Sequence, residues 1–440
     1  MFNVEMESYM VTIFQGLYKA KLKKPQDVLS YIEDGADIII PIANGEPVKL
    51  LDILEENAEY LKDVRIHQML TMHPRKYIDG AYKGHLSHVS YFLSGATRKA
   101  YHNGHCDLMP NYFHEVPSIM KDYTKASLVM AVASPMDEHG YFTLGTQADY
   151  AACFIGNAPF FLEVNEHMPR TFGQNLIHIS QIEGFIEHHA PLVKNPEPVI
   201  EEKDIRIAEY VAEYIKNGDT LQAGIGSIPN AVISLLNDHR HLGIHTELIT
   251  DGVVGLVEKG VVDGSQKKTN KGKIVGTFAL GTDKLYEFLH NNPIVEFQTV
   301  DVTNDPRLIA KEDNIVSINA TTEVDIYGQC ASETVAGKYY SSTGGQFDFA
   351  RGANFAGNGR GFICMHSTTK NDTISRIKVL LTNGSVVTTS KNEVDKVVTE
   401  YGVAELKGKS ISARAKALIE IAHPKFKDEL IFEAKKLNLM

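Results

Sequence analysis

Short runs of consecutive apolar residues alternate with amphipathic patterns in the first half of the chain. Residues 26–34 (QDVLSYIED) predict a short amphipathic helix, residues 38–40 (III) an apolar strand, and Val48–Leu54 a second helix. Residues 127–133 (SLVMAVA) and 159–164 (PFFLEV) predict further strands. Because these runs are apolar throughout, both of their faces are expected to be covered, as in a parallel sheet flanked by helices.

The second half repeats this alternation. A helix is predicted after Asp204, which can cap it, with four apolar positions on one face: Ile207, Val211, Tyr214 and Ile215. The next segment, residues 219–236 (DTLQAGIGSIPNAVISLL), predicts a strand, a glycine-bearing loop and another helix. The repetition indicates two similar open α/β domains with largely parallel sheets.

The boundary between them is expected where both patterns stop. Residues 188–204 (HHAPLVKNPEPVIEEKD) combine three prolines with a run of charges. We therefore assign residues 1–190 to an N-terminal α/β domain, 191–204 to a linker and 205–440 to a C-terminal α/β domain.

Later segments are also expected to belong to this fold. Residues 294–304 and 315–320 predict strands with polar ends, and residues 323–353 predict a long glycine-rich loop. Two C-terminal helices are expected, the first stopped by Pro424 and the second starting at Asp428.

Composition narrows the functional classes. The chain has 440 residues, 43% of them apolar, and a net charge of −11, which disfavours a nucleic-acid or membrane-surface partner. Glu5 and Glu7 argue against a signal peptide, and no apolar run reaches the roughly 18 residues of a membrane span. We expect a cytoplasmic protein.

The cysteines predict reduced thiols and no metal site. Four cysteines lie far apart without a CxxC pair, as is typical of a reducing compartment. His102, His105 and Cys106 have the ligand types for zinc but lack a second pair at finger spacing, so we interpret them as a loop.

Glu247 is the first candidate for chemistry. It lies in GIHTELITDG (residues 243–252), where it opens an apolar run that is expected to end in a turn at Asp251-Gly252. A second candidate is QAGIGSIPN (residues 222–230), because glycines at 224 and 226 allow close approach of a ligand and the following helix can bind phosphate at its N-terminus. A plain strand-to-helix turn explains these glycines equally well.

A dinucleotide-binding fold is the alternative interpretation. The spacing G-x-G-x-x-P nearly matches the dinucleotide fingerprint, and Glu247 follows Gly224 by 23 residues. However, the third glycine is replaced by Pro229, and Glu247 precedes its apolar run instead of ending it. Asp251 would be the better ribose partner.

Two further segments carry possible site residues. Residues 163–173 (EVNEHMPRTFG) place two carboxylates, a histidine and an arginine at a strand end, where ligands bind in α/β sheets. In residues 323–353, the consecutive Gly344 and Gly345 can direct backbone N–H groups into a cavity and stabilise an oxyanion.

Five motifs in order resemble the acetyl-CoA hydrolase/transferase family of coenzyme A (CoA) transferases, closest to the 4-hydroxybutyrate and butyryl-CoA:acetate CoA-transferases. The motifs are SPMDEHGYFTLG (134–145), GIGSIPN (224–230), GIHTELITDG (243–252), TGGQFDFARG (343–352) and VTEYGVAELKG (398–408). The resemblance covers essentially the whole chain.

The resemblance implies a ping-pong reaction through a glutamyl-CoA thioester. A glutamate attacks an acyl-CoA, the anhydride so formed is cleaved by the CoA thiolate, and an acceptor acid reverses these steps. An ordinary glutamate pKa of about 4.3 leaves the nucleophile ionised at neutral pH, so no separate cofactor or metal is expected. CoA is a substrate.

The resemblance also assigns residues. Glu247 is implied as the nucleophile, Gly344 and Gly345 as the oxyanion hole, and Asn304 as the residue that orients Glu247. The implied CoA contacts are Gln222, Ala223, Gly224, Ile225, Gly226 and Gly345, with Lys370 as a possible phosphate partner or else a solvated lysine. The N-terminal half is expected to shape the carboxylic-acid pocket. Glu400 lies in a family motif without an assigned role.

Alternatives remain open within this assignment. The donor could be 4-hydroxybutyryl-, butyryl- or propionyl-CoA with acetate as acceptor, since one methylene changes binding by only about 1–3 kcal/mol. A short-chain acyl-CoA hydrolase using Glu247, with water as acceptor, is the second hypothesis, and an NAD-dependent oxidoreductase is the third. The resemblance implies a homo-oligomer, either a dimer or a tetramer.

Overall fold

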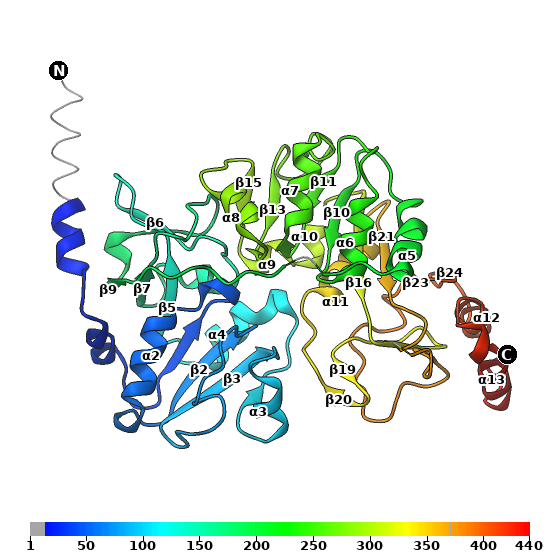
Figure 1. Ribbon diagram of the computed structural model, residues 1–440, viewed down its shortest axis with the longest axis horizontal. Coiled ribbons are helices and arrows are strands. Elements are labelled where there is room, and N and C mark those ends of the chain that lie inside the picture. The colour runs from blue at the N-terminus through cyan, green and yellow to red at the C-terminus, as the bar shows by residue number, and fades with distance from the viewer. Residues whose placement is uncertain (1–13, 197, 370) are drawn as a thin grey trace. The chain divides into compact units, whose positions relative to one another are not determined.

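The computed structural model of the chain describes residues 14–196, 198–369 and 371–440 (Figure 1). The described residues form two compact units. The first unit contains the chain up to Asn111, Glu115–Asn195 and Gly276–Asp301, and the second contains Tyr112–His114, Pro196–Val275 and Val302–Met440.

The first unit is built on a seven-stranded sheet in which every registered pair is parallel. Its strands, in spatial order, are β4 (Asp107–Leu108), β3 (Leu86–Phe92), β2 (Val64–Met69), β1 (Asp37–Ile40), β5 (Leu128–Ala133), β7 (Phe160–Val164) and β9 (Gly184–Glu187). The strands predicted at 38–40, 127–133 and 159–164 are confirmed as β1, β5 and β7. All of their residues are buried, which explains why their sequences are apolar without alternation.

The helices of the first unit only partly match the pattern. Residues Val48–Glu56 form α2 as predicted, but residues 26–34 do not form an α-helix: Pro25–Tyr31 is the 3₁₀ helix η1. Only Val28 of η1 is buried, so this segment lacks the apolar stripe that stabilises a longer helix.

The remaining elements of this part of the chain are short. They are η2 (Ala43–Gly45), η3 (Ala58–Tyr60), α3 (Arg98–His102), α4 (Val116–Tyr123), β6 (Tyr141–Thr143), η5 (Ala151–Phe154), β8 (Leu176–His178), η6 (Ile179–Gln181), β14 (Phe278–Ala279), α8 (Asp283–Leu289) and β15 (Val295–Phe297). The 3₁₀ helix η4 (Phe113–Glu115) begins in the segment that belongs to the second unit. Strand β6 pairs antiparallel with β8.

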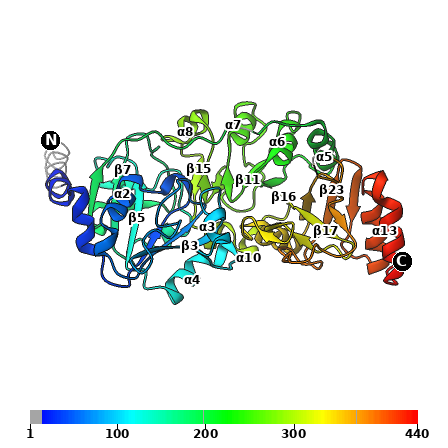
Figure 2. The same ribbon diagram turned by 60° about the horizontal axis from the view of Figure 1, so that its bottom comes forward.

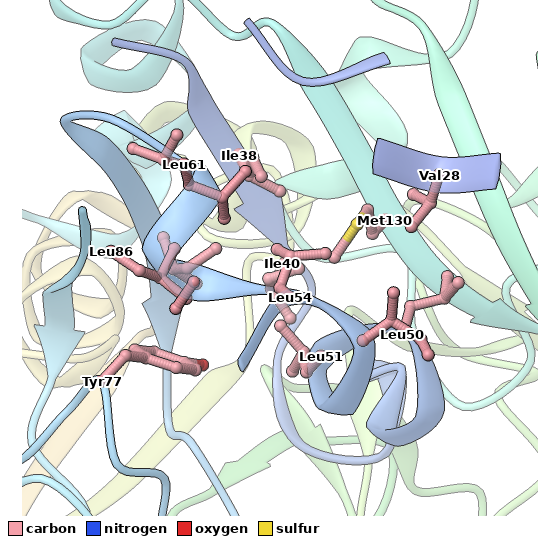
Figure 3. Packing of buried hydrophobic residues seen from close by; sticks show 14 of the residues in the cluster. Val28, Ile38, Ile40, Leu50, Leu51, Leu54, Leu61, Tyr77, Leu86 and Met130 are labelled. Carbon is pink, nitrogen blue, oxygen red and sulfur yellow. The ribbon is translucent and has the colours of Figure 1, made fainter. Parts of the chain in front are cut away.

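The apolar core of the first unit lies between α2 and the sheet (Figure 3). Helix α2 buries Leu50, Leu51, Ile53 and Leu54, which pack with Ile38 and Ile40 of β1 and Met130 of β5. This contact fixes the central strands against the helix.

The second unit is also built on a mostly parallel sheet. Its strands, in spatial order, are β13 (Ile274–Gly276), β11 (Gly243–His245), β10 (Thr220–Ala223), β16 (Ile315–Ala320), β21 (Arg360–Cys364), β23 (Lys396–Thr399) and β24 (Gly402–Glu405). Only β23 and β24 pair antiparallel among the registered neighbours of this run. The strand predicted at 315–320 is confirmed as β16.

Three helices lie side by side along this sheet in both views: α5 (Glu202–Ala212), α6 (Ser227–Ser234) and α7 (Asp251–Glu258) (Figures 1 and 2). The prediction that Asp204 caps α5 is wrong. Glu201 is the N-cap, and Asp204 lies inside the first turn, where its side chain accepts the Glu201 N–H at 2.8 Å. Tyr214 and Ile215 lie beyond the helix.

Two polar segments form different structure from that predicted. The strand expected over 294–304 stops at Phe297, and α9 (Val300–Thr303) and α10 (Pro306–Ile309) follow. The long loop expected over 323–353 contains short strands and then α11 (Gln346–Phe355), because the two glycines precede a helix instead of continuing a loop. Its strands are β17 (Glu323–Asp325), β18 (Cys330–Ala331), β19 (Thr334–Val335) and β20 (Lys338–Tyr339).

The other elements of the second unit complete it. They are β12 (Leu248–Ile249), β22 (Ile377–Lys378), α12 (Ile411–Glu420) and α13 (Pro424–Lys436). The last helix begins at Pro424, not at Asp428 as predicted, because proline is well tolerated in the first helical turn. Among the described helices, none is long and apolar enough to cross a membrane.

The core contact of α2 predicts a large effect of truncation. Replacing the fully buried Leu54 by Ala should lower the free energy of unfolding by about 2–5 kcal/mol, because it removes apolar contacts and leaves a cavity. The matched exposed variant is Tyr60→Ala, at a residue that is 87% exposed. Urea unfolding followed by circular dichroism measures both, and equal midpoints for the two variants would contradict the assignment of this core.

Candidate active site

Glu247 lies in a tight connection between two buried strands of the second unit. It is two residues beyond the end of β11, and β12 follows it directly. The expectation that a turn follows at Asp251-Gly252 is wrong, since Asp251 begins α7. An aspartate in the first turn is favourable there because it faces the positive end of the helix dipole.

Asn304 holds the carboxylate of Glu247 from one side. The Asn304 side chain is fully buried, and its Nδ2 donates to Glu247 Oε2 at 3.0 Å. Asn304 lies between α9 and α10, and the next residue, Asp305, caps α10 by accepting the Arg307 N–H. The short helices on both sides thus fix the position of the amide.

The N-terminus of α11 approaches Glu247 from a second direction. Gly345 is the N-cap of this helix, and its N–H donates to the Glu247 carboxylate. A Cβ atom on Gly345 would lie 1.9 Å from Glu247 Oε2 and 2.5 Å from Asn304 Nδ2. Only glycine allows this approach. Gly344 has a φ of +58°, in the left-handed region that also favours glycine.

The environment of Glu247 changes its protonation. Burial of the carboxyl group is the main cause that raises its pKa, from the ordinary 4.5 to about 7, and the negative charge of Asp348 raises it further. Hydrogen bonds from Asn304 and Gly345 oppose this shift. The expectation of an ordinary glutamate pKa is therefore wrong for this site, where Glu247 is only partly ionised at neutral pH.

Asp348 and His114 lie behind Asn304. Asp348 is the third residue of α11 and is fully buried, and its Oδ1 lies 2.7 Å from His114 Nδ1. Its Oδ2 accepts the His114 backbone N–H at 3.2 Å and lies 3.5 Å from Asn304 Nδ2. Sequence reasoning missed both residues. Asp348 stands inside the motif TGGQFDFARG, which was the only available signal.

His245 supports the same connection from within β11. Its Nε2 lies 2.8 Å from the backbone carbonyl of Thr303, so this nitrogen carries the proton and donates. Burial lowers the pKa of His245 to about 4, so the ring is neutral at physiological pH. The contact anchors the residue before Asn304.

The glycine loop after β10 leads into α6, in the order of strand, loop and helix that the sequence predicts. Gln222 is buried and pairs with Asn319 of β16: Gln222 Nε2 donates to Asn319 Oδ1 at 3.1 Å, and Asn319 Nδ2 donates to Gln222 Oε1 at 3.0 Å. The Gln222 side chain thus joins two strands. Ile225 is 53% exposed at the loop, and Gly226, with a φ of +131°, is the N-cap of α6.

A cavity of about 570 Å³ opens beside the N-terminus of α6 in the second unit. It is lined by Ser227 and Ile228 of α6, by residues at the ends of β16 and β21, and by the basic side chains Lys203, His366 and Arg376. The predicted Lys370 lies outside the described residues. Its neighbours Thr369 and Asn371 line this cavity.

Glu400 lies next to the cavity. Its carboxylate accepts the Ser367 N–H and Oγ–H, both at 2.8 Å, and lies 3.6 Å from Lys203 Nζ. Lys203 also pairs with Asp372 at 2.6 Å. Glu400 therefore fixes the segment after β21 and partly neutralises Lys203.

The candidate residues of the first unit form two separate arrangements. Glu163 pairs with His188 at 2.8 Å and accepts the Leu50 N–H, which is a buried structural contact. Glu166 and His167 line a cavity of about 420 Å³. Among residues 14–196, 198–369 and 371–440, no three His, Cys, Asp or Glu side chains are placed to hold a metal ion.

Comparisons with known proteins agree with these motifs. Residues 6–201 match the acetyl-CoA hydrolase/transferase N-terminal domain, and residues 281–434 match the acetyl-CoA hydrolase/transferase C-terminal domain. The chain is 44% identical to succinyl-CoA:cyclohexane-1-carboxylate CoA transferase of Geobacter metallireducens, over 96% of both chains. It is 42% identical to 4-hydroxybutyrate coenzyme A transferase of Clostridium kluyveri, over 96% of this chain and 99% of the relative.

A solved structure is similar over the same range. The crystal structure of 4-hydroxybutyrate CoA-transferase from Porphyromonas gingivalis superimposes with a TM-score of 0.80 at 33% identity, covering 96% of this chain and all of the other. The mixed α/β fold with mostly parallel sheets is thus shared.

The pKa of Glu247 predicts how stability depends on pH. The folded chain binds the Glu247 proton more tightly than the unfolded chain, so the Glu247 contribution to the free energy of unfolding falls as pH rises from 4.5 through about 7. Glu247→Gln removes this contribution. We expect the free energy of unfolding of the variant, relative to that of the wild type, to be about 1–3 kcal/mol higher at pH 8 than at pH 5.

Urea unfolding at the two pH values measures this difference. Glu213→Gln is the control because Glu213 is exposed in the second unit. The raised pKa would be contradicted if Glu247→Gln and the wild type differed in free energy of unfolding by the same amount at both pH values.

Proposed function

We infer that this chain, which belongs to the acetyl-CoA hydrolase/transferase family, is a CoA transferase that moves CoA from an acyl-CoA to a free carboxylic acid. The observation that carries the mechanism is the single carboxylate of Glu247, which is held by the Asn304 amide and the Gly345 N–H. Such a carboxylate is fixed in position, and its ionised form is a nucleophile.

The first half-reaction transfers CoA to the enzyme. A Glu247 oxygen attacks the thioester carbonyl of the acyl-CoA, the carbon–sulfur bond breaks, and an acyl-glutamyl anhydride and CoA thiolate result. The thiolate then attacks the glutamyl carbonyl, so the first acid leaves with the bridging oxygen and Glu247 becomes a CoA thioester. The acceptor acid reverses both steps. No atom is oxidised or reduced in these steps. We propose that no separate cofactor takes part.

The raised pKa of Glu247 suits this role. A carboxylate whose pKa is about 7 is a stronger nucleophile than an ordinary one and is still largely ionised at slightly alkaline pH. The anhydride and thioester are neutral, so their formation removes the repulsion between Glu247 and Asp348. The buried site thereby stabilises the neutral acylated forms of Glu247 relative to the free carboxylate.

The donors that hold Glu247 are placed to stabilise the oxyanions. When the glutamyl carbonyl is attacked, its oxygen gains negative charge at the position that Asn304 Nδ2 and the Gly345 N–H already contact. Fixed donors in a site with little water stabilise such charge strongly. We propose Gly344 as the residue that sets the backbone direction of Gly345.

We propose the cavity beside α6 as the place of the CoA phosphates. The N-terminus of α6 and the side chain of Arg376 supply positive potential there. Lys203 also lines the cavity, but its charge is offset by Asp372 and Glu400, and the acids Glu201 and Asp204 lie in the same lining. Burial lowers the pKa of Arg376, but an arginine stays charged at neutral pH. Ala223, Gly224, Ile225 and Gly226 would present backbone to CoA, and Gln222 would hold their strand in place through Asn319.

The names of the relatives suggest the substrates. One acts on 4-hydroxybutyrate, and another links succinyl-CoA with a cyclic carboxylic acid. We propose 4-hydroxybutyryl-, butyryl- or propionyl-CoA as donor and acetate as acceptor. A cytoplasmic homo-oligomer stays a prediction from the sequence.

A covalent adduct tests this function. Incubation with butyryl-CoA in the absence of acceptor should add the mass of CoA to the intact protein, less one water, on the peptide that contains Glu247. Added acetate should remove the adduct and yield acetyl-CoA, and Glu247→Gln should remain unmodified. Intact-protein and peptide mass spectrometry measures each result.

Other outcomes separate the alternatives. Steady release of CoA from butyryl-CoA without acceptor would identify a hydrolase in which water is the final acceptor. If a panel of acyl-CoAs gives neither an adduct nor CoA release, the transferase assignment is contradicted, and an absorbance assay for hydride transfer tests the oxidoreductase hypothesis.

A further inference from the structure

We propose that Asp348, held by His114, is a positioning residue that locks the Asn304 amide toward Glu247 and makes Glu247 a stronger nucleophile. This inference rests on the proposed function. Asp348 does not contact Glu247 directly in any hydrogen bond that the described residues form, so its effect passes through Asn304 and through its charge.

The first argument concerns the orientation of the amide. An asparagine side chain has a donor end and an acceptor end of nearly equal shape. Asn304 Nδ2 lies 3.0 Å from Glu247 Oε2 and 3.5 Å from Asp348 Oδ2, so its NH₂ group faces two carboxylates. A flipped amide would direct Oδ1 at both. Both carboxylates therefore disfavour the flipped amide, and without the charge of Asp348 only Glu247 would do so.

The second argument concerns how Asp348 itself is fixed. Its side chain is fully buried, and His114 supplies two donors, the backbone N–H and the imidazole Nδ1–H. The ring of Tyr112, two residues before His114, stacks on Phe347 at a centroid distance of 4.2 Å. Segment 112–114 therefore docks on the first turn of α11 through both an aromatic and a polar contact.

The third argument is electrostatic. Asp348 is the ionisable group whose charge raises the pKa of Glu247, while Asn304 and Gly345 lower it. Burial raises the pKa of Asp348 as well, and His114 and Asn304 oppose that shift. His245, two residues before Glu247, is neutral, and the carboxylate of Asp305, which lies near His114, is paired with Arg307. Asp348 is thus the group whose negative charge acts on Glu247.

Asp348→Asn tests the first and third arguments in one variant. It removes the charge but keeps the size of the side chain. Glu247 should therefore titrate at lower pH, and the Asn304 amide should lose its fixed orientation. The rate of thioester formation at neutral pH should fall by roughly 10-fold, less than the roughly 10²–10³-fold cost of losing a direct oxyanion donor. The acidic limb of the pH–rate profile should move to lower pH.

Rapid-quench mass spectrometry of the Glu247 adduct, formed from butyryl-CoA between pH 5 and pH 9, measures the rate of thioester formation and the position of the acidic limb of the pH–rate profile. A merely structural change would lower the rate without moving the limb. The control is Asp305→Asn, because asparagine also caps a helix and, among the described residues, the Asn304 amide bonds to Glu247 and Asp348 and not to Asp305. This control should leave the limb in place.

His114 gives a second, independent pair of variants. His114→Ala should slow thioester formation because Asp348 loses its side-chain donor, and His114→Asn should recover most of the rate because its Nδ2–H can take the place of the imidazole Nδ1–H. An unchanged limb in Asp348→Asn, or equal rates in the two His114 variants, would overturn the proposal. A wild-type enzyme that forms no adduct would instead contradict the proposed function itself.

Discussion

The site depends on one constraint: three elements must bring their ends together around the carboxylate of Glu247. The connection after β11 carries Glu247, the turn between α9 and α10 carries Asn304, and the N-terminus of α11 carries Gly345. The approach is so close that a methyl group on Gly345 would overlap the carboxylate. Burial at this point raises the pKa of Glu247 to about 7, which makes the group costly as a free carboxylate and favourable as a neutral acyl derivative.

The parallel sheet of the second unit positions the connection that carries Glu247. Strands β10, β11 and β16 run in the same direction, so the segments that follow them leave from the same edge. The pair Gln222–Asn319 joins β10 to β16 just before that edge, and His245 of β11 binds the carbonyl of Thr303. These buried contacts hold the strands and the turn in place without using Glu247 or the Gly345 N–H, the two groups proposed to take part in the reaction.

The sequence predicted the α/β fold because buried parallel strands are continuously apolar, as in β1, β5, β7 and β16. It predicted Glu247 only through family motifs, since its local pattern is that of an ordinary strand end. The pattern could not show α11, because the preceding glycines suggested a loop, nor that residues 276–301 group with the first unit. It also could not show Asp348 beside His114, because 234 residues separate them and long-range contacts leave no periodicity.

The most direct test of the account is the fate of oxygen in Glu247. If the acceptor acid attacks a glutamyl-CoA thioester and CoA then attacks the acyl carbonyl, the bridging oxygen remains on the enzyme. Turnover of acetyl-CoA with acetate labelled in both oxygens with ¹⁸O should therefore add ¹⁸O to Glu247 and to no other carboxylate, as peptide mass spectrometry would show. Unlabelled Glu247 after many turnovers, with CoA nevertheless exchanged between the acids, would contradict a glutamyl intermediate.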